Sequence, residues 1–371
     1  MSTAYLVLDD GRIFEGEHWA THGEAFGEAV FSTGMTGYQE TLTDPSYYKQ
    51  VVIMTAPHIG NTGMNSTDEE SRRIWVSGFV VRNPSSVVSN WRSERSLEED
   101  LIANKVVGIK GIDTRALTLH LRDKGSMRVG IFSNTKLSAD EMLTKVRGGQ
   151  EMSGSYLVED VTTPESYVVQ PLIAPRFKVA AIDLGIKAAT PRNMAERGIE
   201  VHTVPAGTTY QYIKDQGFDG LFLSNGPGDP ATMDDVVKLV QNALADHLPI
   251  FGICFGHQIL GRAIGLKTYK LRFGHRGINQ PVMNRSTNRV EITAQNHGFA
   301  VAAPLEGSFE TPYGKGVVTH VCLNDNVVEG LKLLEAPAFS VQYHPEAAAG
   351  PHDANYLFDD FYKLLEQHAK R

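Results

Sequence analysis

The feature of this 371-residue sequence that most restricts its fold is an alternation between short apolar runs and segments of helical spacing, which begins at Lys178. Short apolar strands separated by helices indicate βαβ units, which build a mostly parallel sheet covered by helices on both faces. Functional sites in such sheets gather at the carboxyl ends of the strands. The apolar runs are KVAAIDL at 178–184, IEVHTVPA at 199–206, GLFLSN at 220–225 and PIFGIC at 249–254.

The residues before this alternation have a different character. AYLVLDDGRIFEGE, near the N-terminus, is typical of two strands joined by an Asp-Gly turn, and Ser96 followed by Glu99 predicts a capped helix start. Three prolines within 161–177 break helices and favour an extended chain. We therefore predict two domains: a mixed α/β domain rich in β at 1–160 and an α/β domain at 178–371, joined by a connection at 161–177.

Charge and cysteine content exclude several classes of function. The formal net charge of -8 argues against a nucleic-acid-binding or membrane-binding surface. No run reaches the roughly 18 apolar residues of a membrane span, and the first residues lack the features of a secretory signal. The two cysteines, Cys254 and Cys322, cannot form a disulfide framework and do not have zinc-site spacing. We expect a cytoplasmic protein without a metal of its own, in which Cys322 is a buried strand residue.

Cys254 has a more specific setting than Cys322. It lies between a strand-like run and a helical segment, with Gly252 and Gly256 on either side. This G-x-C-x-G pattern is the cysteine form of a nucleophile elbow, in which side chains at the glycine positions would collide as the strand turns into the helix. A helix N-terminus also favours the thiolate, which is the reactive form of cysteine. Taken alone, the pattern fits a buried structural cysteine about as well as a nucleophile.

A candidate base lies in FSVQYHPEAAAG at 339–350. Pro345 prevents a regular helix and favours an extended conformation at His344. In an extended segment His344 and Glu346 point to the same side. A carboxylate beside an imidazole fixes its tautomer and stabilises the imidazolium, as the base for a thiol nucleophile requires. An H-x-E motif is common by chance, and it gains weight here because it follows the elbow in the same predicted domain.

Two further segments predict loops near such a site. LSNGPGDP at 223–230 is a rigid loop whose backbone N–H groups can bind a substrate or stabilise an oxyanion. AQNHGFAV at 294–301 is expected to form a turn between strands at 296–298, with Phe299 packed beside it. Each segment alone would pass for an ordinary loop.

Together, NGPGDP, GICFGHQ, AQNHG and HPE, in this order, resemble the class I (triad) glutamine amidotransferase domain. The first half carries a second resemblance, to the amino-terminal domain of the small subunit of carbamoyl-phosphate synthase. The segments that carry it are TGYQETLTDPSYYKQ (36–50), APHIGNTGMN (56–65), SNWRSERSLEEDL (89–101) and GIDTRALTLHLRDKG (111–125). The two resemblances cover essentially the full chain, and they imply that the first domain contacts a large subunit and contributes to the glutamine site.

The resemblance implies a reaction. Cys254 attacks the side-chain amide carbon of L-glutamine, and ammonia leaves with a proton from His344, which Glu346 orients. Water activated by His344 then hydrolyses the γ-glutamyl thioester to glutamate. The ammonia passes through a tunnel to a separate large subunit, which makes carbamoyl phosphate from bicarbonate and two ATP for pyrimidine and arginine biosynthesis. ATP, magnesium and potassium are expected on that subunit and no cofactor on this chain, within a heterodimer or an oligomer of heterodimers.

The resemblance also implies a glutamine site, with the oxyanion bound by the Phe255 amide and by an amide of the 226–228 loop. Two positions depart from the family pattern. Phe255 replaces an expected leucine, which should alter only packing, and Tyr343 stands where the family often has glycine, which should reshape the pocket rim. The residues implied to bind glutamine are Ser46, Gly226, Gly228, Phe255, Gln258, Asn296, Gly298 and Phe299.

Three alternative functions compete with this interpretation. An amidotransferase serving another synthase is disfavoured by the N-terminal motifs. A catalytically silent scaffold or regulatory subunit would require a hidden defect, because Cys254, His344 and Glu346 are all present. A cysteine peptidase of similar fold is disfavoured by Gln258, the NGPGDP loop and the N-terminal domain.

Overall fold

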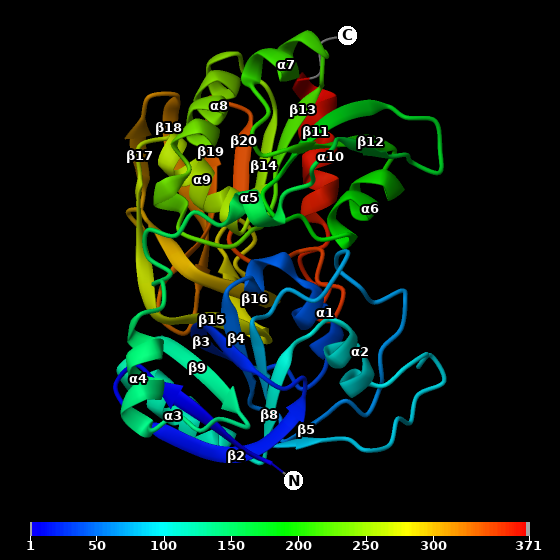
Figure 1. The fold of residues 1–371 in the computed structure, drawn as a ribbon. Coiled ribbons are helices and arrows are strands. Elements are labelled where there is room, and N and C mark those ends of the chain that lie inside the picture. Colours follow the sequence, from blue (N-terminus) through cyan, green and yellow to red (C-terminus); the bar gives the residue numbers. More distant parts are fainter. Residues whose placement is uncertain (1, 369–371) are drawn as a thin grey trace. The chain divides into compact units, whose positions relative to one another are not determined.

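The computed structural model describes residues 2–368 and contains two compact units (Figure 1). Residue 1 and residues 369–371 of the predicted domains lie outside the described residues. The first unit extends to Ser155 and also includes Arg272–Gly277, and the second comprises Tyr156–Leu271 and continues from Ile278.

The first unit is built on a closed barrel with the strand order β1-β2-β8-β6-β4-β3-β9. The predicted N-terminal hairpin is confirmed, because β1 and β2 pair antiparallel across the Asp-Gly turn. The pairs β3–β4, β4–β6 and β6–β8 are parallel, so the barrel mixes both kinds of ladder. The barrel strands are β1 Thr3–Leu8, β2 Ile13–Ala20, β3 Glu24–Ser32, β4 Gln50–Met54, β6 Gly78–Val80, β8 Val107–Lys110 and β9 Arg128–Ser133.

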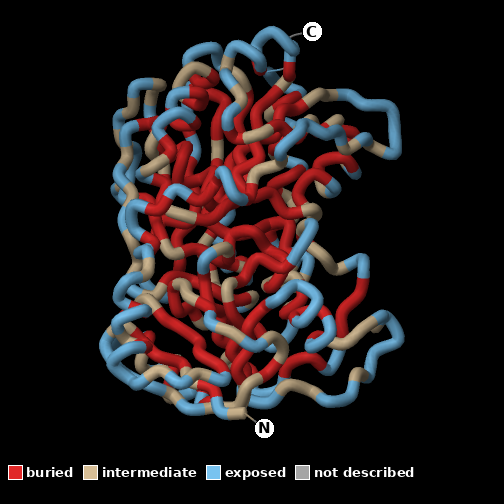
Figure 2. The backbone as a smooth tube through the Cα atoms, in the orientation of Figure 1, coloured by how far each residue is buried: buried red, intermediate tan, exposed pale blue. Residues whose placement is uncertain are grey.

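Alternate residues of a barrel strand pack on opposite sides, as the pleat of a strand requires. In β4, Val52 and Met54 join the apolar cluster of α1 and α2, whereas Val51 and Ile53 join the cluster that contains α3. Figure 2 shows the buried positions following the strands, while exposed positions gather in the connecting segments. The remaining elements are α1 Tyr38–Thr43, η1 Pro45–Tyr47, β5 His58–Ile59, β7 Asn83–Pro84, α2 Leu97–Ala103, α3 Thr114–Lys124 and α4 Ala139–Arg147.

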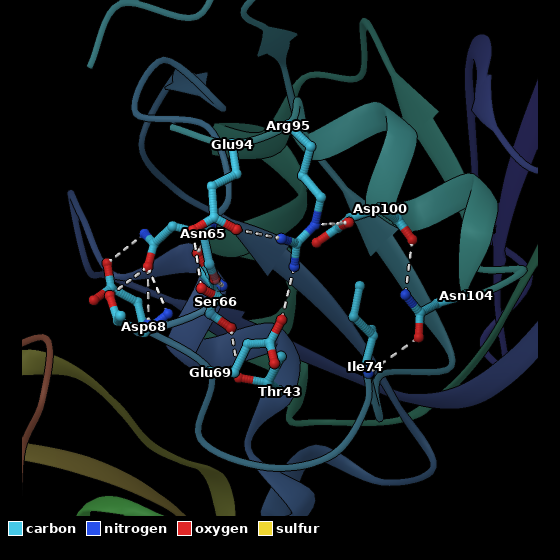
Figure 3. A network of polar contacts seen from close by, with 12 residues as sticks. Thr43, Asn65, Ser66, Asp68, Glu69, Ile74, Glu94, Arg95, Asp100 and Asn104 are labelled. Atoms are coloured by element: carbon cyan, nitrogen blue, oxygen red, sulfur yellow. Dashed lines mark hydrogen bonds and ion pairs between the residues drawn. The ribbon is translucent and has the colours of Figure 1, made fainter. Parts of the chain in front are cut away.

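Polar contacts order the irregular segment that precedes α2 (Figure 3). The Arg95 guanidinium binds Glu69 at 2.7 Å and also contacts Asp100 in α2. Asn65 Oδ1 accepts the backbone N–H of Asp68 at 3.0 Å, which closes a turn. These side chains satisfy polar groups in a segment that has little backbone ladder of its own. The predicted start of α2 is confirmed by a capping box, in which the Ser96 hydroxyl and the Glu99 carboxylate each accept the other residue's backbone N–H.

The second unit contains one large sheet with the order β10-β12-β11-β13-β14-β20-β19-β18-β15-β16, and β17 pairs with β18. The predicted parallel sheet is confirmed for β12, β11, β13, β14 and β20, and antiparallel strands extend it on both sides. The strands are β10 Tyr167–Val169, β11 Phe177–Asp183, β12 Ile199–Pro205, β13 Gly220–Leu223, β14 Ile250–Ile253, β15 Lys267–Asn284, β16 Arg289–Ala302, β17 Ser308–Thr311, β18 Gly314–Cys322, β19 Val328–Leu333 and β20 Ala338–Val341. Strand β10 lies within residues 161–177, which belong to this unit.

Helices cover both faces of the parallel strands, as predicted. In β11, Ala180 and Ile182 face the cluster of α8 and α9, whereas Val179 and Ala181 face the cluster of α6 and α10. None of the helices in residues 2–368 is long and apolar enough to cross a membrane. The helices of this unit are α5 Val158–Val161, α6 Ala189–Glu196, α7 Tyr210–Asp215, η2 Pro230–Thr232, α8 Asp234–Ala245, α9 Phe255–Ala263 and α10 Leu357–His368.

Candidate active site

Cys254 lies at a sharp junction between β14, which ends at Ile253, and α9, which begins at Phe255. Its backbone has φ 55° and ψ -103°, and a positive φ at a non-glycine residue is uncommon and marks strain that the surrounding structure must hold. A Cβ at Gly252 would lie 2.8 Å from the Gly256 carbonyl oxygen, and one at Gly256 would lie 2.7 Å from the Leu223 carbonyl carbon. Both glycines are therefore needed for the turn, which confirms the collision predicted from the G-x-C-x-G pattern.

The Cys254 side chain is buried and lies against strand β16. Its backbone N–H donates to Val341 O at 2.9 Å, and its Sγ lies 3.6 Å from the Asn296 carbonyl oxygen. Cys322, in contrast, is fully buried in β18, where burial raises the pKa of its thiol to about 12. The prediction that Cys322 is a buried strand residue is confirmed.

The predicted contact between His344 and Glu346 is present, but it forms across a turn and not in an extended segment, because the Ala347 N–H donates to His344 O at 3.2 Å. His344 Nδ1 lies 2.7 Å from Glu346 Oε1, and both side chains are buried. Because an ionised carboxylate only accepts, Nδ1 carries the hydrogen and Nε2 is left as an acceptor. His344 Nε2 has no hydrogen-bond partner among the described residues, so it is the ring atom able to take a proton.

Strand β16 contacts both the thiol of Cys254 and the backbone of His344. The His344 N–H donates to Ala294 O at 2.9 Å, and Cys254 Sγ faces Asn296 O. Carbonyl groups two residues apart on a strand point the same way and are about 7 Å apart. The parallel pairing of β14 with β20, in which Ile253 lies opposite Val341, independently places the two segments side by side.

The turn predicted at 296–298 is wrong, because these residues continue strand β16. Their polar character, which suggested a loop, is accommodated by buried hydrogen bonds. His297 Nδ1 lies 2.8 Å from Phe299 O, and His297 Nε2 lies 3.2 Å from Gln295 Oε1. Buried polar groups with such partners are compatible with a strand in the interior.

Lys187 is a site residue that the sequence analysis missed. Its ammonium lies 2.9 Å from Glu346 Oε1 and is largely buried. Burial alone would raise the pKa of Glu346, but the positive charge of Lys187 and the interaction with His344 outweigh burial and lower that pKa to about 2. Lys187 follows β11 at its carboxyl end, the same sheet edge that holds Cys254 and the NGPGDP loop. That position is the signal that could have identified it.

The NGPGDP loop follows β13, next to the elbow in the sheet order. A Cβ at Gly226 would collide with the Leu184 carbonyl group, and Gly228 has φ +95°, so both positions favour glycine. Gly256 N donates to Ser224 O at 3.0 Å, which ties the loop to the first turn of α9. In the described part of the chain, the backbone N–H groups of Gly226, Gly228 and Phe255 have no hydrogen-bond acceptor. They remain available to an anionic oxygen.

The other predicted residues occupy different settings. Gln258 is buried, and its Nε2 donates to Phe299 O at 2.9 Å and to Gln342 Oε1 at 3.1 Å. Gly298 belongs to β16 beside Phe299. Ser46 lies in η1 of the first unit, where it is buried and its N–H donates to an aspartate carboxylate.

The side chains of Phe255 and Tyr343, the two departures from the family pattern, are both buried in apolar clusters. The Phe255 side chain packs into the apolar cluster beneath α9, in line with an effect on packing alone. Tyr343 does not lie at a pocket rim, because its side chain is fully buried and packs in the apolar cluster of α6 and α10.

The arrangement is suited to nucleophilic acyl transfer. It combines a thiol at a strained strand–helix junction, an imidazole whose Nδ1 is held by a buried carboxylate, and N–H groups of the elbow and of the neighbouring loop. Such a combination can form and hydrolyse a thioester, because it supplies a nucleophile, a base and donors for the oxyanion.

Comparison with known proteins places both halves of the chain. Residues 6–131 match the family model described as carbamoyl-phosphate synthase small chain, CPSase domain, and residues 180–364 match the model described as glutamine amidotransferase class-I. The chain is 64% identical over 364 residues to a carbamoyl phosphate synthase small chain of Streptomyces avermitilis, covering 98% of this chain and 96% of that protein.

Two further relatives carry the same description. The relative from Mycolicibacterium paratuberculosis is 59% identical over 366 residues, covering 98% of each chain. The relative from Corynebacterium diphtheriae is 54% identical over 373 residues, covering 100% of this chain and 98% of its own. The identity extends over both halves, so the chain belongs to the carbamoyl-phosphate synthase small chain family and carries a class I glutamine amidotransferase domain.

Proposed function

We propose that this chain is the glutaminase subunit of a carbamoyl-phosphate synthase and that it hydrolyses L-glutamine through Cys254, His344 and Glu346. The observation that carries the proposal is the contact of 2.7 Å between His344 Nδ1 and Glu346 Oε1, beside the strained cysteine of the neighbouring strand. It leaves His344 Nε2 free to accept a proton. Membership of the family supports the choice of substrate.

In the proposed mechanism, the Cys254 thiolate attacks the amide carbon of the glutamine side chain while the proton resides on His344. The oxyanion is stabilised by the N–H groups of Phe255 and of the Gly226–Gly228 loop, which lack acceptors within the described residues. The tetrahedral intermediate collapses as His344 protonates the leaving ammonia, which yields a γ-glutamyl thioester. Water, deprotonated by His344, then attacks the thioester, and glutamate leaves as Cys254 is regenerated.

The proposed role of Glu346 is to hold one tautomer of His344 and to stabilise the imidazolium formed in both steps. Lys187 keeps that carboxylate ionised, because its charge opposes the penalty of burying an anion. The chemistry uses side chains and backbone groups alone, so no cofactor on this chain is part of the proposal.

We further propose that glutamine is bound by the residues named from the family resemblance. Neutral donors and acceptors suit a zwitterionic substrate that carries a neutral amide. The Gln258 amide is engaged with Phe299 O and Gln342, so contact with glutamine requires it to exchange one of these partners. The proposed glutamine-binding residues are Ser46, from the first unit, and Gly226, Gly228, Phe255, Gln258, Asn296, Gly298 and Phe299.

Ammonia is proposed to travel through a tunnel to a large subunit in the cytoplasm. That partner makes carbamoyl phosphate from bicarbonate and two ATP, for pyrimidine and arginine biosynthesis, and it carries the ATP, magnesium and potassium sites. The domain proposed for residues 1–160 provides the contact with the large subunit. The description of the relatives as small chains supports the existence of a larger partner.

The test is glutamate release from glutamine by the purified chain, with and without a large subunit, beside Cys254→Ala and His344→Ala variants. We expect partner-stimulated hydrolysis that both substitutions abolish. Hydrolysis that does not respond to the large subunit would refute the carbamoyl-phosphate assignment and retain an amidotransferase. A folded complex without hydrolysis under any condition would instead identify a scaffold subunit.

A further inference from the structure

The segment that carries His344 is linked to strand β16 by more than its backbone. The neighbouring Tyr343 is fully buried, and its hydroxyl lies 3.3 Å from Glu291 Oε2. Glu291 belongs to β16, three residues before Ala294, whose carbonyl accepts the His344 N–H. The base is therefore fixed to β16 through its own backbone and through the side chain before it.

The same carboxylate holds a second tyrosine from the segment that follows the base. Tyr356 donates its hydroxyl to Glu291 Oε1 at 2.9 Å. Asn284 Nδ2 donates to Glu291 Oε1 at 2.9 Å and to the Tyr356 hydroxyl at 2.8 Å. A buried carboxylate shared by such donors has a defined position, because each unsatisfied oxygen would cost free energy.

Strand β16 thus presents its contacts in sequence. Glu291 binds the two tyrosines, the Ile292 N–H donates to Asp353 Oδ2 at 3.0 Å, Ala294 O accepts from His344, and Asn296 O faces the Cys254 thiol. These contacts join the segments before and after the base to the strand that contacts the nucleophile.

We propose that Tyr343, Glu291 and Tyr356 form a positioning clamp that sets the place of His344 relative to Cys254. The clamp residues do not touch the reacting atoms, so they are positioning residues and not catalytic ones. The inference rests on the proposed function, because it assigns the clamp to the base of that reaction. Such a clamp matters for activity because a base displaced by a fraction of an ångström loses much of its catalytic efficiency.

The first test substitutes Tyr343→Phe, which removes only the hydroxyl. The ring keeps its packing, including its edge contact with His320 at 5.6 Å between ring centroids. We expect kcat for glutamine hydrolysis in the complex with the large subunit to fall about tenfold while KM changes less than twofold, because the loss concerns the base and not substrate binding. Glu291→Gln keeps an acceptor oxygen for one tyrosine, and we expect it to retain more activity than Glu291→Ala.

A matched control is Tyr210→Phe. It removes a hydroxyl that lies 2.7 Å from the carboxylate of Asp246, in an exposed hydrogen bond of the same unit. We expect its kcat to equal that of the unsubstituted protein. A clamp acts through a shared carboxylate, so the Tyr343→Phe and Glu291→Gln effects should also be non-additive in the double variant.

The second test measures the pH dependence of Cys254 alkylation by iodoacetamide in the full chain, resolved from Cys322 by peptide mass spectrometry. We expect Tyr343→Phe and His344→Ala to move the profile toward that of an ordinary thiol, with its midpoint at about pH 8.5. Thermal unfolding of Tyr343→Phe should stay close to that of the unsubstituted protein. An unchanged profile and kcat in Tyr343→Phe, with both altered in His344→Ala, would refute the clamp and leave the proposed triad. If His344→Ala changes neither quantity, the triad itself is wrong.

Discussion

Gly256→Ala separates the effect of the elbow from the ordinary preference of helices for alanine. Gly256 lies in the first turn of α9, and alanine in place of glycine inside a helix gains up to about 1 kcal/mol. Helix propensity therefore predicts a more stable protein. The structure predicts the opposite, because the added Cβ would lie 2.7 Å from the Leu223 carbonyl carbon and nearer still to its oxygen.

The expected size follows from this overlap. Carbon atoms in contact are about 3.5–4.0 Å apart, so α9 and the end of β13 must separate by about 1 Å. Overpacking of this kind costs about 1–3 kcal/mol, and loss of the 3.0 Å bond from Gly256 N to Ser224 O adds about 1 kcal/mol. After the gain in helix propensity, we expect the free energy of unfolding to fall by about 2 kcal/mol. Displacement of Cys254 by about 1 Å should lower kcat about 100-fold.

The assay combines urea unfolding followed by circular dichroism with glutamate release in the complex. Gly207→Ala is the control, because a Cβ there meets no atom within 4 Å and the backbone is not left-handed. The free energy of unfolding of this variant should be unchanged or higher by about 0.4–1 kcal/mol. A Gly256→Ala protein at least as stable as the unsubstituted chain, with normal kcat, would refute the steric argument.

Three further predictions concern charges and a helix cap. Lys187→Met leaves the buried Glu346 carboxylate without its ion pair, and we expect the free energy of unfolding to fall by about 3 kcal/mol. As a control, Lys363→Met removes an exposed ion pair and should lower it by at most about 0.5 kcal/mol. Equal losses in the two variants would contradict the argument. Because the pKa of Glu346 is lowered from 4.5 to about 2, its contribution to stability is complete above pH 4.5 and is lost as the pH falls toward 2. The free energy of unfolding of Glu346→Gln should therefore fall less steeply over this pH range. A slope equal to that of the unsubstituted protein would contradict this prediction. Asp113→Ala removes the side-chain cap of α3 and should lower the free energy of unfolding, measured by thermal unfolding, by about 1 kcal/mol. Asp113→Asn keeps the acceptor and should lower it less. The reverse order would show that charge matters more than capping.

Local patterns predicted the parts of the molecule that depend on neighbouring residues. The alternation after Lys178 predicted the parallel strands and the helices on their two faces, and the glycines around Cys254 predicted the elbow. The H-x-E motif predicted the contact of His344 with Glu346. The extended segment from which this contact was expected is wrong, because β20 ends at Val341 and residues 345–346 form a turn.

The features that the sequence did not predict depend on contacts between residues that lie far apart in the chain. The parallel barrel pairings, such as β4 with β6, depend on which strands meet after folding, and periodicity does not encode that choice. In the sequence, Lys187 does not differ from an exposed lysine, and only the folded structure places the carboxylate of Glu346 beside it. Residues 296–298 resemble a turn by composition, and only buried partners such as those of His297 make a strand possible there.

The position of β20 in the sheet also bears on how the chain folds. β20 is the last strand of the sheet in the sequence, yet it lies between β14 and β19 and joins the parallel strands to the antiparallel ones. The sheet therefore cannot be completed in the order of synthesis, and pairing across such sequence separation is slow. Until β20 is inserted, Cys254 has no nearby imidazole from His344. Partly folded forms of the chain should consequently be inactive toward glutamine, and recovery of hydrolysis during refolding should follow the slowest step of sheet assembly.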